Sequence, residues 1–419
     1  MKEYREIEAW MRANPEASHE TLLVESLPSP TFRHEGRMLV SFSTNNYLAL
    51  ATSERLISAA EKGLRKFGVG NCESRLLGGD LEIYREVERK LARMKKKQDA
   101  VLYATGYLTN LGVLNALVKS PQICRFYGFR PSTRMKYAYF TDELNHISIR
   151  EGIRMSEADR VSYRHLDLNH LESSLKRSDA HCKIIVTDGV FSQDGDIAPL
   201  PDLMKLADLY DATVYVDDAH GTGVLGANGG GISEHFGCYG ERLIHMGTLS
   251  KAYGAIGGFV AADAGICEIL RLTSSAYGFT STLPPDQAYA VSEAIEMVQD
   301  EPARRANLWA NQRKFVSMMQ AADFELVSTE TPIVPVVIGS ETDCDRFAAR
   351  LRDFGFHVDP VKFPAVAKGK SRLRIILNAH HTDNQIRNLI EAMKIARSEL
   401  ELRTGIETRA MPPTLAALA

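Results

Sequence analysis

The chain has 419 residues, of which 44% are hydrophobic, and a formal net charge of -3. This length suffices for one large domain and a smaller one, and the nearly balanced charge argues against a dedicated nucleic-acid binder. The six cysteines form no CxxC pair and no stretch reaches the roughly 18 apolar residues of a membrane span, so we expect a soluble cytoplasmic protein without a metal site or disulfide scaffold.

The first 290 residues predict an α/β domain. Residues 1–20 predict a helix or an arm, 38–42 a short strand, and 53–67 and 81–94 helices with apolar residues three and four apart. Short apolar runs then alternate with helical segments: 100–103 before 108–118, 183–187 before 200–210, then 213–216 and 243–246. Strands followed by helices indicate a mainly parallel sheet with helices on both faces, and such sheets bind ligands at the carboxyl ends of their strands.

The pattern changes after residue 290. Residues 291–324 predict a helix, and 333–338, 344–354, 372–377 and 383–399 predict strand, helix, strand and helix. We therefore predict an N-terminal segment at 1–40, a large domain at 41–290, a small α+β domain at 291–400 and a tail at 401–419.

The segment GTLSKAYGAIGGFVA places Lys251 in a turn of small residues directly after an apolar strand. Most lysines are simply exposed at the surface. A flexible amine among glycines and hydroxyls is also suited to form a Schiff base with an aldehyde.

Two further segments suit a ring-shaped, phosphorylated cofactor. In VYVDDAHGTGVLG, Asp217 ends a strand and could keep a ring nitrogen protonated, and His220 could bond a ring hydroxyl. A helix cap and an ordinary histidine are the alternatives. In YATGYLTNLGVL, a glycine turn enters a helix and presents backbone N–H groups that suit a phosphate, although a plain strand-to-helix turn has the same pattern.

Taken together and in this order, these segments resemble the α-oxoamine synthases, which are enzymes of fold type I that use pyridoxal 5'-phosphate (PLP). The resemblance runs from about residue 41 to 399. It implies a large domain with a mainly parallel sheet, a smaller C-terminal α+β domain, and a homodimer with shared active sites. It also implies a C-acyltransferase that condenses glycine, alanine or serine with an acyl thioester of CoA or an acyl carrier protein, usually with loss of CO2, to give an α-amino ketone.

The resemblance assigns roles to five residues around the cofactor ring. Lys251 is implied to hold PLP as a Schiff base and later to move the α-proton. Asp217 is the implied partner of the ring nitrogen, and His220 contacts the ring oxygen. His146, in DELNHIS, is implied to stack on the ring, and Ser192, in DGVFSQDGD, to lie near the ring oxygen.

The phosphate and the substrate are implied to contact other residues. For the phosphate these are Thr105, Gly106, Tyr107 and Thr248, with Thr280 reaching the phosphate of a neighbouring subunit; serine or phenylalanine is more usual at two of the positions 105–107. For the substrate they are Asn45, in STNNYLAL, and Arg374, in SRLRIILNAHH. Arg75, in the stretch NCESRLLGGD where the family shapes its acyl pocket, could meet a polar acyl end or the CoA.

The segment 119–139 is longer than the connection usual in the family. It contains five basic residues, several aromatic ones and no acidic one: Lys119, Arg125, Arg130, Arg134 and Lys136 are the basic ones. A neutral surface insertion is one interpretation, and a docking surface for an anionic acyl donor is the other.

Two other functions stay open at this point. Another fold type I PLP enzyme, such as an aminotransferase, would share the lysine and the aspartate. A non-catalytic partner subunit would lack the lysine, which is present here as Lys251.

Overall fold

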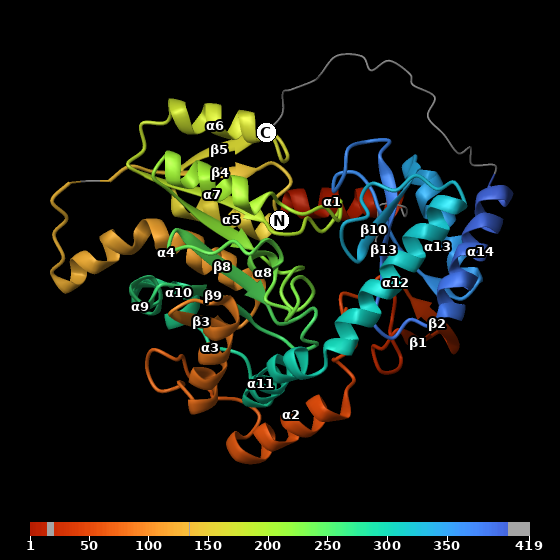
Figure 1. Cartoon of the computed structure of the whole chain (residues 1–419), viewed down its shortest axis with the longest axis horizontal. Helices are drawn as coiled ribbons and strands as arrows, with labels where there is room; N and C mark the ends of the chain where they lie inside the picture. The colour runs from red at the N-terminus through yellow and green to blue at the C-terminus, as the bar shows by residue number, and fades with distance from the viewer. Residues whose placement is uncertain (15–20, 134, 401–419) are drawn as a thin grey trace.

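A computed structural model describes residues 1–14, 21–133 and 135–400. Figure 1 shows a large lobe built on one extended sheet and a small lobe that contains α12 (Pro302–Ala321), α13 (Glu341–Asp353) and α14 (Asp383–Glu399). The α/β class and the fold type I arrangement predicted from the sequence are confirmed.

The sheet of the large lobe has seven strands in the order β3-β9-β8-β7-β6-β4-β5. Their bounds are β3 Asp99–Tyr103, β4 Tyr137–Asp142, β5 Asp159–Tyr163, β6 Cys182–Asp188, β7 Ala212–Asp217, β8 Leu243–Thr248 and β9 Gly258–Ala262. Strand β9 is antiparallel to β3 and β8, and the other neighbours are parallel. The carboxyl ends of β4, β6, β7 and β8 therefore lie at one edge.

Helices cover both faces of this sheet because strand residues alternate between two hydrophobic clusters. In β7, Val214 and Val216 pack in one cluster and Tyr215 in the other. The first cluster includes residues of α3 (Glu82–Lys95), α6 (Leu168–Arg177) and α7 (Leu200–Leu209). The second includes residues of α4 (Gly106–Cys124), α5 (Ile147–Ser156) and α9 (Ala264–Thr273).

The small lobe contains two three-stranded sheets. In one, β13 (Ser371–Ile376) pairs antiparallel with β10 (Ile333–Gly339) and β12 (Asp359–Val361). In the other, β2 (Arg37–Ser41) pairs with β1 (Thr31–His34) and lies parallel to β11 (Phe356–His357). The strands near the N-terminus thus complete the C-terminal lobe.

A proline divides the helix predicted at 291–324. The structure has α11 (Pro285–Asp300), then α12 from Pro302. Pro302 has no N–H to donate and begins a new helix. Helix α2 (Glu54–Phe67) packs on α11. The described residues also form the short helices η2 (Arg125–Tyr127), α8 (Ile232–Phe236) and α10 (Ser275–Gly278).

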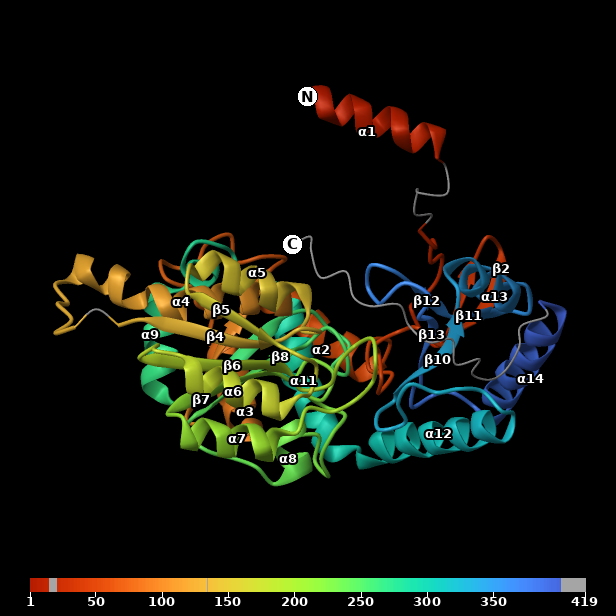
Figure 2. The same ribbon diagram turned by 90° about the horizontal axis from the view of Figure 1, so that it is seen from above.

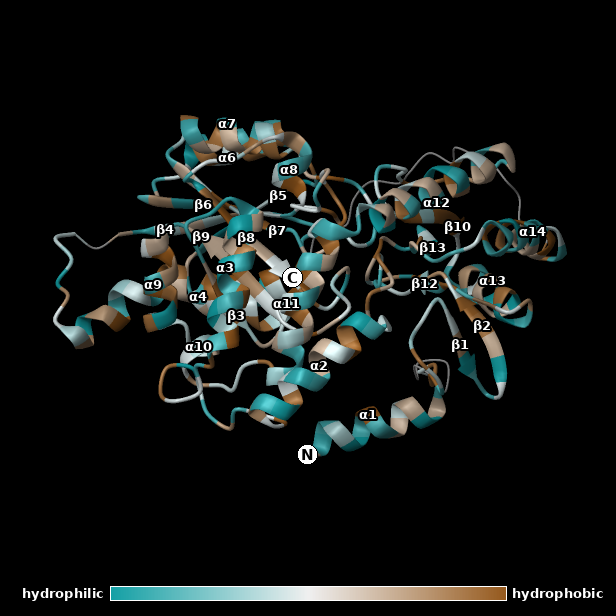
Figure 3. Cartoon of the chain, turned by 60° about the horizontal axis from the view of Figure 1, so that its bottom comes forward, coloured by the Kyte–Doolittle hydropathy of each residue, from teal (hydrophilic) through white to brown (hydrophobic). Residues whose placement is uncertain are grey.

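Helix α1 (Lys2–Ala13) confirms the helix expected near the N-terminus but has no buried residue. Figure 2 shows it apart from both lobes, and Figure 3 shows hydrophilic and hydrophobic residues along it. None of the helices in the described parts of the chain is both long and apolar enough to cross a bilayer.

Candidate active site

Nine of the predicted site residues line one cavity of about 220 Å³ at the carboxyl edge of the large sheet. They come from segments that follow five different strands, as the parallel arrangement requires. They are Thr105, Gly106, Tyr107, His146, Ser192, Asp217, His220, Thr248 and Lys251.

Asp217, the last residue of β7, is fixed by two donors. The amide of Asn110 on α4 donates to Asp217 Oδ2 at 2.7 Å, and the backbone N–H of Ala219 donates to Oδ1 at 3.1 Å. Asn110 is itself oriented because its side-chain oxygen accepts the Tyr215 hydroxyl at 2.7 Å. A buried carboxylate with both oxygens held by donors is well suited to attract the proton of a ring nitrogen.

The same asparagine connects Asp217 to His146. Asn110 Nδ2 also lies 2.8 Å from Ser148 Oγ, and Ser148 Oγ lies 2.7 Å from His146 Nδ1. His146 is the N-cap of α5, and its backbone N–H donates to Asp188 Oδ2 at 3.1 Å. Burial lowers the pKa of His146, although the nearby Asp217 carboxylate opposes the shift. The imidazole is therefore held neutral and in a fixed orientation.

His220, which lines the cavity, bonds a buried tyrosine. Its Nδ1 lies 2.7 Å from the hydroxyl of Tyr47. Burial, followed by the positive charge of Lys251, lowers the pKa of His220 well below its ordinary value. A Tyr47 hydroxyl that donates to Nδ1 leaves the proton on Nε2, so that His220 presents an N–H to the cavity.

Lys251 follows β8 in the loop before β9 and is partly buried. Burial lowers the pKa of its amine, although the carboxylates of Asp217 and Asp188 oppose the shift. Asp188 lies at the end of β6, where burial and the charge of Asp217 raise its pKa well above its ordinary value. A lysine with a lowered pKa has a larger fraction of the uncharged amine that reacts with aldehydes.

The N-terminus of α4 also lines the cavity, through Thr105, Gly106 and Tyr107. Thr105 is the N-cap, and its hydroxyl accepts the N–H of Leu108 at 3.1 Å. A Cβ on Gly106 would lie 3.0 Å from Thr248 Oγ1, so a glycine leaves the backbone N–H groups accessible. Thr248 Oγ1 lies 2.8 Å from Ser250 Oγ, and both line the cavity. Hydroxyls and free N–H groups at a helix N-terminus form a site for a phosphate.

Two of the predicted substrate residues lie beside this cavity. Arg374, on β13 of the small lobe, donates from Nε to the Ser192 carbonyl at 2.5 Å and from Nη2 to Asn45 Oδ1 at 3.3 Å. The structure thus joins Arg374 and Asn45, which are more than 300 positions apart in the sequence, beside a cavity whose lining belongs to the large lobe.

The structure places Arg75 and Thr280 elsewhere. The Arg75 side chain is fully buried and pairs with Glu88 at 2.6 Å and Asp80 at 2.7 Å. Its charge is therefore neutralised inside the large lobe, away from the cavity lining. Thr280 follows α10, and its hydroxyl donates to the Ser281 carbonyl at 3.2 Å. Neither residue lines the cavity in its own subunit.

Sequence reasoning missed Tyr47, Asn110, Ser148 and Asp188. Each lies two to four residues from a predicted site residue, in the segments NNYLAL, TGYLTN, NHIS and TDGVFS. Asparagine, serine and tyrosine have too many common structural roles for their type alone to identify such partners. Proximity to a motif was the available signal.

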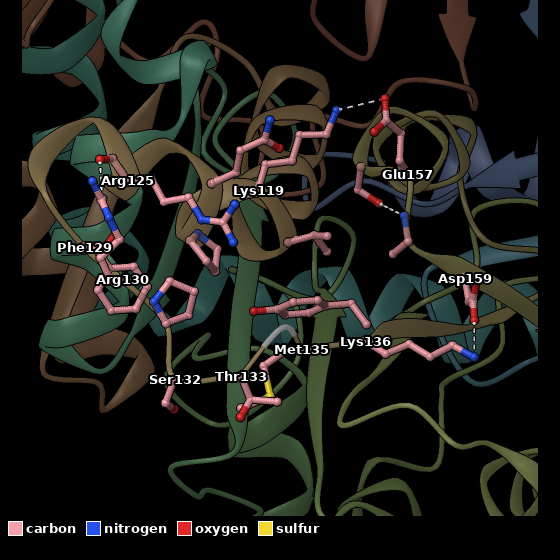
Figure 4. Close-up of a pocket in the computed structure, with 17 residues that line it drawn as sticks. Lys119, Arg125, Phe129, Arg130, Ser132, Thr133, Met135, Lys136, Glu157 and Asp159 are labelled. Atoms are coloured by element: carbon pink, nitrogen blue, oxygen red, sulfur yellow. Dashed lines mark hydrogen bonds and ion pairs between the residues drawn. The ribbon is translucent and has the colours of Figure 1, made fainter.

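A larger cavity, of about 1110 Å³, lies at the 119–139 insertion (Figure 4). Two of its basic residues are paired: Lys119 with Glu157 at 3.4 Å and Lys136 with Asp159 at 3.2 Å. Arg130 donates to the carbonyl of Arg125 at 3.0 Å. Arg134 lies outside the described residues. The α4 residue of this cavity that lies nearest to Gly106 along the helix is Val118, 12 positions further on, which is about 18 Å at roughly 1.5 Å per residue.

A family model and the sequences of known proteins both match this chain over most of its length. The aminotransferase class I and II family matches residues 37–393. The chain is 39% identical over 380 residues to 8-amino-7-oxononanoate synthase 1 of Bacillus velezensis, which covers 90% of this chain and 93% of the relative.

Two solved structures are similar over almost the whole chain. One is a high-resolution structure of SPT with PLP, at 28% identity and a TM-score of 0.87, covering 96% of this chain and 99% of that chain. The other is the serine palmitoyltransferase of Sphingomonas wittichii, at 27% identity and a TM-score of 0.85, covering 95% and 97%.

The residues around the smaller cavity fit PLP group by group. Lys251 faces the cavity with an amine of lowered pKa, Asp217 with a carboxylate that two donors hold, and α4 with its N-terminal N–H groups. These are the groups that an aldehyde, a pyridine nitrogen and a phosphate require. The chain therefore belongs to the aminotransferase class I and II family, and within it to the PLP-dependent α-oxoamine synthases.

Proposed function

We propose that this enzyme condenses glycine, alanine or serine with an acyl thioester, carried on CoA or an acyl carrier protein, and releases CO2. The observation that carries the proposal is one cavity that combines Lys251, Asp217 and His220 and that Arg374 of the small lobe approaches. The names of the relatives, 8-amino-7-oxononanoate synthase and serine palmitoyltransferase, support an acyl transfer rather than an amino transfer.

Bound PLP supplies an electron-withdrawing ring that stabilises negative charge on the α-carbon of an amino acid. The protein residues control where that charge and the proton go. Asp217, fixed by Asn110 and Ala219, keeps the ring nitrogen protonated. Lys251, with its lowered pKa, accepts the α-proton and can return it.

Arg374, Asn45 and Ser192 orient the amino acid substrate. The Arg374 guanidinium is a planar, permanently charged donor that suits the carboxylate of the amino acid. Its bonds to the Ser192 carbonyl and to Asn45 fix its direction. In the overall reaction the α-carbon bonds to the acyl carbon, the C–S bond breaks with release of the thiol, and the bond to the carboxylate then breaks with release of CO2.

We also propose that the enzyme is a homodimer with Thr280 near the phosphate site of the partner subunit. Thr280 does not line the cavity of its own chain. Ser74 and Ser281 form a β-bridge, which joins the loop before α3 to the loop after α10. Each of these two loops exposes a large apolar side chain, Leu77 in the first and Phe279 in the second. A second copy of the chain would remove this apolar surface from water.

We propose that the enzyme is located in the cytoplasm. The six cysteines are free thiols, as is usual in that reducing compartment.

Borohydride reduction of the purified holoenzyme tests the cofactor assignment. We expect a yellow protein in which reduction fixes the cofactor covalently on Lys251, as mapped by peptide mass spectrometry. Lys251→Ala should retain some PLP but lose turnover. Lys183, whose amine lies 3.3 Å from the Tyr210 carbonyl, provides a control, and Lys183→Ala should stay active. Full turnover by Lys251→Ala would exclude the assignment.

A further inference from the structure

The loop at 189–198, between β6 and α7, forms a short hairpin that carries Ser192. Val190 and Ile197 form an antiparallel bridge. Inside the turn, the Gly195 N–H donates to the Phe191 carbonyl at 2.8 Å and the Phe191 N–H to the Asp196 carbonyl at 3.1 Å. Ser192 lines the cavity, and its carbonyl accepts the bond from Arg374. The position of this loop therefore affects the positions of both Ser192 and Arg374.

His165 connects this loop to the large lobe. Its Nδ1 lies 3.1 Å from Asp142 Oδ1, at the end of β4, and its Nε2 lies 2.9 Å from Asp196 Oδ2, in the loop. The imidazole also contacts the Phe191 ring edge to face, with centroids 4.5 Å apart. Asp142 is buried and accepts the N–H groups of Leu144 and Leu166 at 2.9 and 3.0 Å, so this end of the bridge is fixed.

Both ring nitrogens of His165 face carboxylate oxygens, so both must donate. Only the protonated imidazolium has two N–H donors; a neutral ring would direct a lone pair at one carboxylate. Burial lowers the pKa of His165, but its bonds to Asp142 and Asp196 outweigh this and raise it to about 10. The ring therefore carries a positive charge at neutral pH and binds both carboxylates.

The small lobe holds the other side of the loop. The Thr331 hydroxyl donates to the Gly195 carbonyl at 2.8 Å, and the Ile197 N–H donates to Glu330 Oε2 at 3.1 Å. Arg372 forms an ion pair with Asp194. The loop is thus held between the lobes, with His165 as a side-chain anchor from the large lobe.

We propose that His165 is a positioning residue, whose two bonds to Asp142 and Asp196 hold the 189–198 loop so that Ser192 and Arg374 are correctly placed for the amino acid substrate. The proposal rests on the function proposed above for the same cavity. The contribution of His165 is indirect: it contacts the loop, and the loop contacts Arg374.

The test compares His165→Gln with His170→Gln. His170 lies five residues further on, and its Nδ1 accepts the backbone N–H of Arg164 at 3.1 Å, so it is a matched control outside the bridge. Hydrogen–deuterium exchange should show amides of 189–198 exchanging about tenfold faster in His165→Gln, equivalent to about 1.4 kcal/mol of local opening free energy. The exchange of the same peptide in His170→Gln should match the parent.

Kinetics and a second substitution separate positioning from general destabilisation. In His165→Gln the KM of the amino acid should rise about tenfold, while the KM of the acyl donor stays within about twofold of the parent. Asp196→Ala, which removes the acceptor, should have the same effect, and the double variant should be no worse than either single one, because both remove one bridge.

Three results would overturn the inference: exchange in His165→Gln equal to that in His170→Gln, a loosened loop with an unchanged KM for the amino acid, or fully additive effects in the double variant. A parent protein that binds PLP but shows no acyl transfer would instead refute the proposed function. The exchange measurement would still report on the bridge in that case.

Discussion

At the scale of single residues, Asp217 and Asn110 set the electrostatics of the site. Asn110 donates to Asp217 and, through Ser148, orients His146. One buried amide thus fixes both Asp217 and, through Ser148, His146. Such a network stabilises a charge only while every member is bonded, because an unsatisfied buried group is costly.

Asp217→Asn tests this arrangement. A neutral amide no longer holds the ring proton, so we expect kcat to fall by about 100-fold or more, the size usual for losing one charge-stabilising group in a buried site. The amide has one acceptor oxygen for two donors, Asn110 and Ala219, so stability should fall by about 1–3 kcal/mol.

Denaturant unfolding and steady-state kinetics measure the two effects separately. Asn110→Asp is the counterpart, because it places a second carboxylate against Asp217 and should also lower activity. A folded Asp217→Asn enzyme with parental kcat would show that the residue is only a structural cap.

Site residues with a distinctive motif were predictable from the sequence. Lys251 among small residues and Asp217 after an apolar strand have few common alternatives in combination. Asn110 and Tyr47 were not predictable, because their roles depend on contacts with Asp217 and His220 that lie more than 100 residues away. Arg75 shows the reverse: its place in the segment 71–80 predicted a contact with the substrate, whereas Glu88 and Asp80 neutralise its charge inside the large lobe.

At the scale of elements, α4 determines which cavity can serve the reaction. Its N-terminus faces the site, and its C-terminus leads to the basic insertion. The insertion cavity lies beside the amino end of β4, whereas the site lies at the carboxyl ends of the strands. Because the insertion cavity and the site lie at opposite ends of the parallel strands, the structure does not favour docking of the acyl donor at the insertion for reaction in the same subunit.

Replacement of Arg125 and Arg130 by serine tests the role of the insertion. We expect the KM values of amino acid and acyl donor to stay within about twofold of the parent, with an unchanged dependence on salt. The reason is that Arg125 is the C-cap of α4, about 28 Å from Gly106 at roughly 1.5 Å per residue, and Arg130 bonds to the carbonyl of Arg125. A higher KM for carrier-bound donors alone would show instead that the insertion is a docking surface.

Many helices and strands followed from local patterns, but others did not, among them β4, α5, β5, α6 and β9. Strand β9 was missed because GFVAA follows glycines and is apolar throughout, with no alternation to mark it as an antiparallel strand. The break between α11 and α12 had a local signal, Pro302, which the apolar spacing of 291–324 obscured.

At the scale of the whole molecule, the site depends on contacts between the two lobes. Strands β1 and β2 pair with β11, and Arg374 of the small lobe bonds Ser192 and Asn45. No local pattern predicts a pairing across more than 300 residues. The alternation of strands and helices nevertheless predicted four strands of the large sheet, β3, β6, β7 and β8, because each of these units is local in sequence.

A mixing experiment tests the proposed homodimer. Lys251→Ala and Thr280→Ala homodimers should each be impaired, and subunit exchange between them should restore part of the activity. In a mixed dimer with shared sites, both defects fall in one site and the other site is intact. A fully active monomer in sedimentation velocity would contradict this.

The most direct test of the proposed reaction is the coupled release of two products. The holoenzyme is given glycine, alanine or serine labelled in the carboxyl group, together with acyl thioesters of CoA and of an acyl carrier protein, and free thiol and labelled CO2 are measured together. We predict equal amounts of thiol and CO2 for at least one pair, only when both substrates are present, and none with Lys251→Ala. Transfer of the amino group to a keto acid with no thiol release would contradict the account and indicate an aminotransferase.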